Sequence, residues 1–229
     1  MKNWTVDDVM TKKVVSVPQT ASYREVVDLL VGRRISAVPV VDEFQHVTGV
    51  VSEADLLRKI EYAGDDEPRL FERRRRRGER AKALAGTAAE LMSSPPVVTR
   101  AGTPIAAAAR AMDAEQVKRL PVVDDRGLLI GIVTRGDLLK VHLRPDEEIR
   151  ADIVSGVLGK FRAEDVGPVT VAVDDGVVTM AGRVARRSAA DLAVRLARQV
   201  SGVVRVIDEI EFDFDDSEML INGGAYGVA

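Results

Sequence analysis

The sequence contains no cysteine and only two histidines, His46 and His142, among its 229 residues. The missing cysteine excludes disulfide bonds, thiolate metal ligands and cysteine nucleophiles. With so few histidines, a multi-histidine metal site is not expected, and general-base catalysis by histidine has few candidate residues. No Ser-His-Asp arrangement, phosphate-binding glycine loop or metal-ligand spacing stands out. We therefore predict a protein that is not an enzyme, has no metal site and requires no cofactor.

The sequence also has no long apolar run. Residues 1–8 lack the apolar core of a signal peptide, and no run approaches the roughly 18 residues that span a bilayer. We therefore expect a cytoplasmic protein. Hydrophobic residues make up 46% of the chain and charged residues 30%, which is typical of chains that build folded cores. Because the net charge is −3, nucleic acid is not an expected partner unless a local patch attracts it.

An internal repeat dominates the first two thirds of the chain. The residues Val-Pro-Val-Val-Asp at 38–42 return as Leu-Pro-Val-Val-Asp at 120–124. The stretch Gly-Val-Val-Ser-Glu-Ala-Asp-Leu-Leu at 49–57 returns as Gly-Ile-Val-Thr-Arg-Gly-Asp-Leu-Leu at 131–139. Both pairs are separated by 82 positions, and a shared register of this kind indicates a repeated structural unit.

Each repeat predicts a strand, a helix, two strands and a second helix. Apolar residues at helical spacing predict a helix over 20–30, and an alanine-rich stretch predicts its counterpart over 103–112. The last helix begins at Ser52 and at Thr134, whose hydroxyl groups can cap free backbone N–H groups. Strands are expected at 14–17, 37–41 and 47–52 in the first repeat and at 97–99, 120–123 and 129–134 in the second, with short preceding helices at 6–10 and 88–92.

The pattern changes after residue 145. Apolar residues from Ile149 to Leu158 predict a helix, and alternation from 169 to 184 predicts a hairpin that turns at 174–176. An amphipathic helix at 188–200 and a strand at 203–214 complete an α-β-β-α-β unit. The predicted organisation is a first repeat at 1–62, an arginine-rich connector at 63–87, a second repeat at 88–143, a small α+β domain at 146–216 and a tail at 217–229.

The connector contains five consecutive arginines, Arg73–Arg77. One interpretation is a solvated helical connector. The other is a patch for nucleic acid, anionic lipid or ligand phosphate. Phe71 is the one aromatic residue interleaved with these basic residues, so base stacking on nucleic acid is poorly supported.

The doubled block resembles the CBS domain family over about residues 5–60 and 88–142. The motifs are apolar-Pro-Val-Val-Asp and Gly-apolar-Val-(Ser/Thr)-x-x-Asp-Leu-Leu. The resemblance implies an α/β fold in which two β-α-β-β-α repeats pack as a pseudo-symmetric pair, a Bateman module, with two clefts. Such modules often form homodimers, and family members bind AMP, ATP, S-adenosylmethionine or related molecules. We therefore expect an adenosine-containing nucleotide, namely AMP, ADP, ATP or S-adenosylmethionine, as a regulatory ligand.

The resemblance also implies which residues hold the ligand. Asp55 and Asp137 match the ribose-binding aspartate of the family, and a carboxylate can accept hydrogen bonds from two vicinal hydroxyls. Phosphate is expected at the helix N-termini beside Ser52 and Thr134. Further expected ligand-binding residues are Ser16 and Thr99 at the adenine edge, and Ala37, Val38, Pro39, Arg119, Leu120 and Pro121 around the base.

The two clefts differ in expected charge. The second cleft is expected to place three cations near the phosphate, namely Lys118, Arg119 and Arg135. In the first cleft Glu53 occupies such a place and repels phosphate. We therefore expect the nucleotide in the cleft of Thr99, Thr134 and Asp137. The alternative role of Asp55 and Asp137 is that of a helix N-terminal carboxylate that stabilises the helix dipole.

The C-terminal unit resembles the BON domain over about residues 147–214. Its motifs are Val-Val-Thr-apolar-x-Gly at 177–182, after an Asp-Gly turn, and Gly-Val-x-x-Val at 202–206. The resemblance implies a protein or phospholipid partner, although the acidic stretch 208–216 would repel an anionic membrane surface. The basic residues expected to form a separate patch are Arg183, Arg186, Arg187, Arg195 and Arg198.

These observations predict a cytoplasmic regulatory protein whose CBS pair binds the nucleotide and relays its occupancy to the BON domain. One alternative is a scaffold that has lost its ligand and acts through the BON domain. Another is a protein that binds an anionic surface or nucleic acid through Arg73–Arg77, in which case binding falls steeply with salt.

Overall fold

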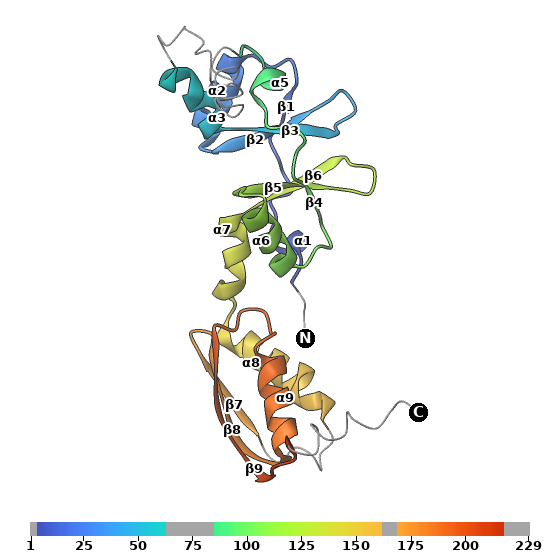
Figure 1. Ribbon diagram of the computed structural model, residues 1–229, viewed down its shortest axis with the longest axis vertical. Coiled ribbons are helices and arrows are strands. Elements are labelled where there is room, and N and C mark those ends of the chain that lie inside the picture. The colour runs from blue at the N-terminus through green and yellow to red at the C-terminus, as the bar shows by residue number, and fades with distance from the viewer. Residues whose placement is uncertain (1–3, 63–84, 162–168, 218–229) are drawn as a thin grey trace, which may run out of the picture. The chain divides into compact units, whose positions relative to one another are not determined.

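The protein is described here by a computed structural model that covers residues 4–62, 85–161 and 169–217 (Figure 1). These residues divide into two compact units. The first unit spans Thr5–Leu138, and the second contains Trp4 and the described residues from Leu139 onward. In the ranges that the structure describes, no helix is long and apolar enough to cross a membrane.

The first unit contains two repeats with the predicted succession of elements. The first repeat consists of β1 (Val17–Pro18), α2 (Tyr23–Arg33), β2 (Ala37–Val41), β3 (Val47–Ser52) and α3 (Glu53–Glu61). The second repeat consists of β4 (Thr99–Arg100), α6 (Ile105–Ala114), β5 (Arg119–Val123), β6 (Leu129–Thr134) and α7 (Arg135–Leu139). The expected α/β fold is confirmed, although β1 and β4 are shorter than the sequence predicts.

Each repeat forms one three-stranded sheet. The first strand pairs in parallel with the second, which pairs antiparallel with the third. All five residues of β2 are buried, because its apolar side chains are covered on both faces. Val26 and Leu30 of α2 pack with Val51 of β3 in the core of the first repeat. Within the first unit, Figure 1 shows the two sheets in the middle, with α2 and α3 outside the first sheet and α6 and α7 outside the second.

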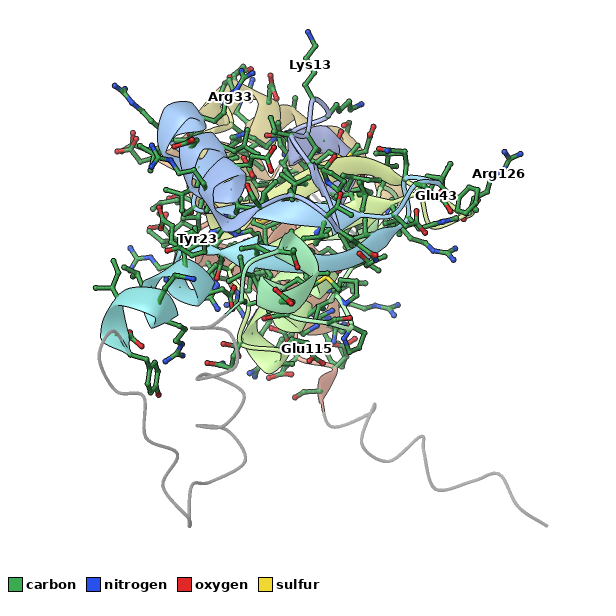
Figure 2. All side chains as sticks on the ribbon, turned by 90° about the horizontal axis from the view of Figure 1, so that it is seen from above. Lys13, Tyr23, Arg33, Glu43, Glu115 and Arg126 are labelled. Carbon is green, nitrogen blue, oxygen red and sulfur yellow. The ribbon has the colours of Figure 1, made fainter. Side chains whose placement is uncertain are left out.

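The two β-hairpins lie on the same side of this pair. The backbone N–H of Leu129 donates to the carbonyl oxygen of Gln45 at 3.2 Å, which joins the second hairpin to the first. Figure 2 shows Glu43 and Arg126, from the two hairpin loops, on this side of the molecule. The hairpins therefore help to hold one repeat against the other.

The short helices that precede the repeats exchange partners. α1 (Val6–Val9) lies beside α6 of the second repeat, and its first backbone N–H donates to the carbonyl oxygen of Thr103 at 2.9 Å (Figure 1). α5 (Ala88–Leu91) lies beside α2 of the first repeat, where its first N–H donates to the carbonyl oxygen of Ala21 at 2.8 Å. Each packed half of the unit therefore contains the leading segment of the other repeat.

Two glycines permit this exchange. Gly49 on β3 lies against Met92, and Gly131 on β6 lies against Met10. A Cβ atom at Gly49 would lie 2.8 Å from the Cβ of Met92, and one at Gly131 would lie 2.5 Å from the Sδ of Met10. Only a residue without a side chain lets each methionine approach its strand this closely.

The second unit has the predicted α-β-β-α-β order. β7 pairs antiparallel with β8, whereas β8 and β9 are parallel and are connected through α9. Ile149 of α8, Met180 of β8 and Val194 of α9 meet in its core. Asp175 and Gly176, with φ of 47° and 74°, form the predicted turn between β7 and β8. The elements are η1 (Lys140–Leu143), α8 (Asp146–Gly156), η2 (Leu158–Lys160), β7 (Thr170–Asp174), β8 (Val177–Arg186), α9 (Arg187–Ala197) and β9 (Arg205–Phe214).

A buried arginine connects three parts of the second unit. The side chain of Arg144 is only 5% exposed, and its Nη2 lies 3.0 Å from the Oδ2 of Asp152 on α8. Its Nη1 donates to the carbonyl oxygen of Ser201, before β9, at 2.6 Å. The guanidinium carbon lies 5.7 Å from the centre of the Trp4 ring. These partners offset part of the cost of removing the charge from water.

Candidate functional site

A cavity of about 510 Å³ lies between the two repeats of the first unit. Its size is within the roughly 300–1,000 Å³ that small-molecule sites occupy. Three segments meet around it: the start of β2 and the end of β3 with the start of α3, the segment that leads into the second repeat, and the start of β5. The lining residues are Ser36, Ala37, Val50, Ser52, Glu53, Ala54, Asp55, Leu57, Ser93, Pro95, Pro96, Val97, Gln116, Val117, Lys118 and Arg119.

Ser52 and Asp55 form the start of α3 at the wall of this cavity. The backbone N–H of Ser52 donates to the Oδ2 of Asp55 at 2.9 Å, and its hydroxyl donates to the same oxygen at 2.7 Å. Both side chains are partly buried. The carboxylate thus stabilises the helix start, the alternative role considered above, while it faces the cavity.

Thr134 and Asp137 repeat this geometry in the second repeat. The N–H and hydroxyl of Thr134 donate to the Oδ2 of Asp137 at 2.9 and 2.7 Å. The N–H of Asp137 also donates back to the hydroxyl oxygen at 3.2 Å. The two predicted aspartates therefore occupy equivalent places in the two halves of the pair.

Arg119 reaches from the second repeat into the first. Its backbone lies opposite Thr134 in the β5–β6 ladder, but its Nη2 donates to the Oγ of Ser36 at 2.8 Å. Burial lowers the pKa of Arg119, and the negative charge of Glu53 acts in the opposite direction. The guanidinium remains charged at neutral pH, because an arginine starts from a pKa above about 12.

The structure therefore groups the expected cations differently from the sequence analysis. Lys118 and Arg119 line the same cavity as Ser52 and Asp55, whereas the sequence analysis placed them with Thr134 and Asp137. The physical reason is that β5 begins at the boundary between the repeats, so side chains at its start lean into the other half. Arg135, the third expected cation, is exposed at the start of α7 and does not line this cavity.

The other predicted residues are dispersed. Ala37 lines the cavity, whereas Thr99 does not line it and pairs with Val122 in the second sheet. Ser16 lines a different cavity, together with Asp42 and Glu43. The remaining members, Val38, Pro39, Leu120 and Pro121, are buried within β2 and β5.

The segment that leads into the second repeat is part of the site, although no motif in the sequence predicts this. Ser93, Pro95, Pro96 and Val97 line the cavity because this segment packs on the first repeat, where Ser93 bridges to Val50 of β3. The one signal in the sequence is that Met92, just before this segment, shares the repeat offset with Met10. That signal shows that Met92 occupies a repeated position, but it does not show which repeat the segment after Met92 packs against.

Two of the five arginines expected to form a separate basic patch in the second unit are paired with acidic side chains. Arg183 of β8 lies 2.6 Å from Glu211 and 2.9 Å from Asp213 of β9, so it does not belong to a basic patch apart from the acidic strand. Arg187 pairs with Asp215 at 2.8 Å. A hydrogen bond from Ser217, together with Arg187, lowers the pKa of Asp215 to about 2.

Two predicted features have no counterpart among the described residues. The arginine run Arg73–Arg77 lies outside them, and so does the tail beyond Ser217. In the part of the chain that the structure describes, no group of three or more His, Asp or Glu side chains is placed to bind a metal ion.

Comparison with known proteins matches both parts of the chain. The model of the CBS domain matches residues 6–62 and 88–144, and the model of the BON domain matches residues 145–213. A crystal structure of CBSX2 in complex with AMP is 33% identical, covers 61% of this chain and 97% of that one, and superposes with a TM-score of 0.54.

Relatives of similar sequence occur in plants and archaea. The chloroplastic CBS domain-containing proteins CBSX2 and CBSX1 of Arabidopsis thaliana are 32% and 33% identical over 63% and 62% of this chain. The matches cover 66% and 65% of those proteins, so the chain spans just under two thirds of their length. An uncharacterized protein of Methanocaldococcus jannaschii is 31% identical over 59% of this chain and 89% of its own length.

Proposed function

The chain belongs to the family of CBS-domain proteins and carries a BON domain after its CBS pair, and from this premise we propose that it is a regulatory protein whose CBS pair binds an adenosine-containing nucleotide. The observation that carries the proposal is the cavity between the repeats, where Asp55, Ser52 and the two cations Lys118 and Arg119 meet. These groups suit, in turn, the ribose, the phosphate linkage and the phosphate charge of one nucleotide.

The chemistry of each wall supports this assignment. A carboxylate has about four acceptor positions, so Asp55 can hold the start of α3 and accept a ribose hydroxyl together. The N-terminus of α3 favours an anion through its backbone N–H groups and helix dipole. Pro95, Pro96 and Val97 offer apolar atoms for a base in the same cavity. The similar CBS pair that was crystallised with AMP favours adenine as that base.

Thr99, Thr134, Arg135 and Asp137 are proposed as a second ligand site. Its support is the geometric equivalence of the Thr134–Asp137 pair to the Ser52–Asp55 pair. This second cleft has less positive charge than the sequence predicts, because Lys118 and Arg119 line the cavity of Asp55 instead. We therefore propose the cavity of Asp55 as the stronger nucleotide site.

We further propose a homodimer and a relay to the BON domain. Val31 of α2 and Leu57 and Ile60 of α3 are 73%, 50% and 70% exposed, an apolar surface that a second copy of the chain would cover. The chain passes between the two units both after Trp4 and after Leu138, which offers two covalent routes for a relay. When nucleotide binds, the surface that the BON domain exposes to a protein or phospholipid partner would then change.

Calorimetric titration with AMP, ADP, ATP and S-adenosylmethionine tests nucleotide binding, with wild type and Asp55→Ala compared. We expect the variant to lose at least tenfold in affinity, because a hydrogen bond to a charged group contributes about 1.5–3 kcal/mol. Asp137→Ala reports on the second cleft. If none of the four compounds binds wild type, the proposed function is wrong.

Glu25→Ala is the matched control for a lost helix cap. Glu25 accepts from the N–H of Ser22 at 2.7 Å at the start of α2, as Asp55 does from Ser52, but it does not line the cavity. Both substitutions remove the carboxylate of a capping box, so both weaken the start of a helix. Equal loss of binding in both variants would indicate that Asp55 acts only through the fold.

A further inference from the structure

The cavity of Asp55 receives its positive charge from the other repeat. Arg119 and Lys118, both from the second repeat, correspond by the repeat offset to Ala37 and Ser36 in the first. The first repeat therefore has no cation at these two positions to donate in return. This asymmetry gives one of two otherwise equivalent clefts an arginine that reaches across the boundary.

Arg119 is held near the place proposed for the phosphate. Its Nη2 donates to the Oγ of Ser36 at 2.8 Å, and the carbonyl oxygen of Ser36 accepts from the N–H of Glu53, the first residue of α3, at 3.1 Å. The guanidinium thus lies beside the N-terminus of a nine-residue helix at the cavity wall. Its hydrogen bond to Ser36 goes to a neutral hydroxyl, and a phosphate would be a stronger acceptor.

Glu53 opposes the accumulation of negative charge in the same cavity. It lines the cavity together with Asp55, and its charge interacts with Arg119. Two cations and two carboxylates therefore meet there. Because Asp55 is assigned to the ribose, Glu53 is the carboxylate that would repel each additional phosphate group. The corresponding residue of the second repeat is Arg135, which has the opposite charge.

We propose, on the basis of the nucleotide-binding function above, that Arg119 selects for one phosphate group and that Glu53 selects against a longer phosphate chain. The cavity then takes a nucleoside monophosphate in preference to both the neutral nucleoside and the triphosphate. Binding exchanges the hydrogen bond to Ser36 for a charge-assisted, bidentate contact of the guanidinium with the phosphate. The bound ligand thereby links the second repeat to the first.

The test is the ratio of affinities for adenosine, AMP and ATP, measured by calorimetry on the full chain at fixed salt. Arg119→Ala is expected to lower the affinity for AMP by about tenfold to a hundredfold and to leave that for adenosine unchanged. Arg119→Lys keeps the positive charge but loses the planar guanidinium. Its affinity for AMP is expected to lie between those of wild type and Arg119→Ala. Glu53→Gln is expected to raise the affinity for ATP relative to AMP by several-fold.

Arg126→Ala is the matched control, because Arg126 is an exposed arginine of the same repeat in a hairpin loop that does not line the cavity (Figure 2). It should leave every ratio unchanged. Thermal unfolding of each variant separates loss of folding from loss of selectivity. An AMP-to-adenosine ratio that is the same in Arg119→Ala and wild type overturns the selection by Arg119 and leaves nucleotide binding intact. If wild type binds neither compound, the proposed function itself fails.

Discussion

Replacing Gly49 by alanine should destabilise the first unit. The new Cβ would lie 2.7 Å from the Cγ and 2.8 Å from the Cβ of Met92, well inside the roughly 3.5–4.0 Å of an ordinary carbon contact. The Cβ of Met92 is attached to the backbone directly after α5, so no side-chain rotation removes the overlap. Overpacking of this kind costs about 1–3 kcal/mol. At about 2–4 °C per kcal/mol, the expected decrease in melting temperature is about 2–12 °C.

Gly131→Ala is the matched control at the equivalent position of the second repeat. Its closest contact, at 2.5 Å, is with the Sδ of Met10, near the flexible end of the side chain, and the Cγ lies 3.3 Å away. Rotation of Met10 relieves this contact, so the expected loss is smaller. Thermal unfolding followed by circular dichroism compares both variants with wild type. Equal decreases in the two variants, or none in Gly49→Ala, would refute the reasoning.

Three further predictions concern other parts of the chain. Arg144→Met breaks the buried ion pair with Asp152 and should lower the free energy of unfolding by about 3–5 kcal/mol in urea denaturation; a loss below about 1 kcal/mol contradicts this. Asp215→Asn should lower the melting temperature near neutral pH and have a much smaller effect at pH 2. The pKa of Asp215 is lowered from 3.8 to about 2 in the fold, so its contribution is full above 3.8 and disappears as the pH falls through 2; an equal effect at both pH values contradicts this. The double substitution Leu57→Asp and Ile60→Asp should yield a single-chain mass by light scattering where wild type yields two chains, and a single-chain mass for wild type argues against the dimer.

The order of helices and strands can be predicted from the sequence because it depends on local patterns. The strands Ala37–Val41 and Val47–Ser52 lie where apolar β-rich runs predict them, and α3 and α7 begin directly after Ser52 and Thr134. Helix capping, strand alternation and turn chemistry act between residues a few positions apart. The CBS and BON resemblances rest on the same short motifs, and the family matches confirm them.

Local patterns in the sequence predict only some of the residues of the candidate site. The spacing of Ser52 and Asp55 shows that both belong to the start of one helix, and the structure places both at the cavity wall. The prediction that Lys118 and Arg119 act beside Asp137 followed from their position in the second repeat. Nothing in the spacing shows that the Arg119 side chain extends toward Ser36, 83 positions away.

By itself, the sequence determined two repeated α/β units, a small α+β domain after them, and the residue types that a nucleotide site would use. Only the tertiary structure decided that α1 packs on the second repeat and α5 on the first, that one cavity receives both Lys118 and Arg119, and that Arg183 is paired with the acidic strand. The reason is physical. Secondary structure follows from neighbours along the chain. The repeat in which a side chain packs depends instead on the long-range packing of whole elements. Because the two repeats have nearly the same pattern, they offer nearly equal packing partners.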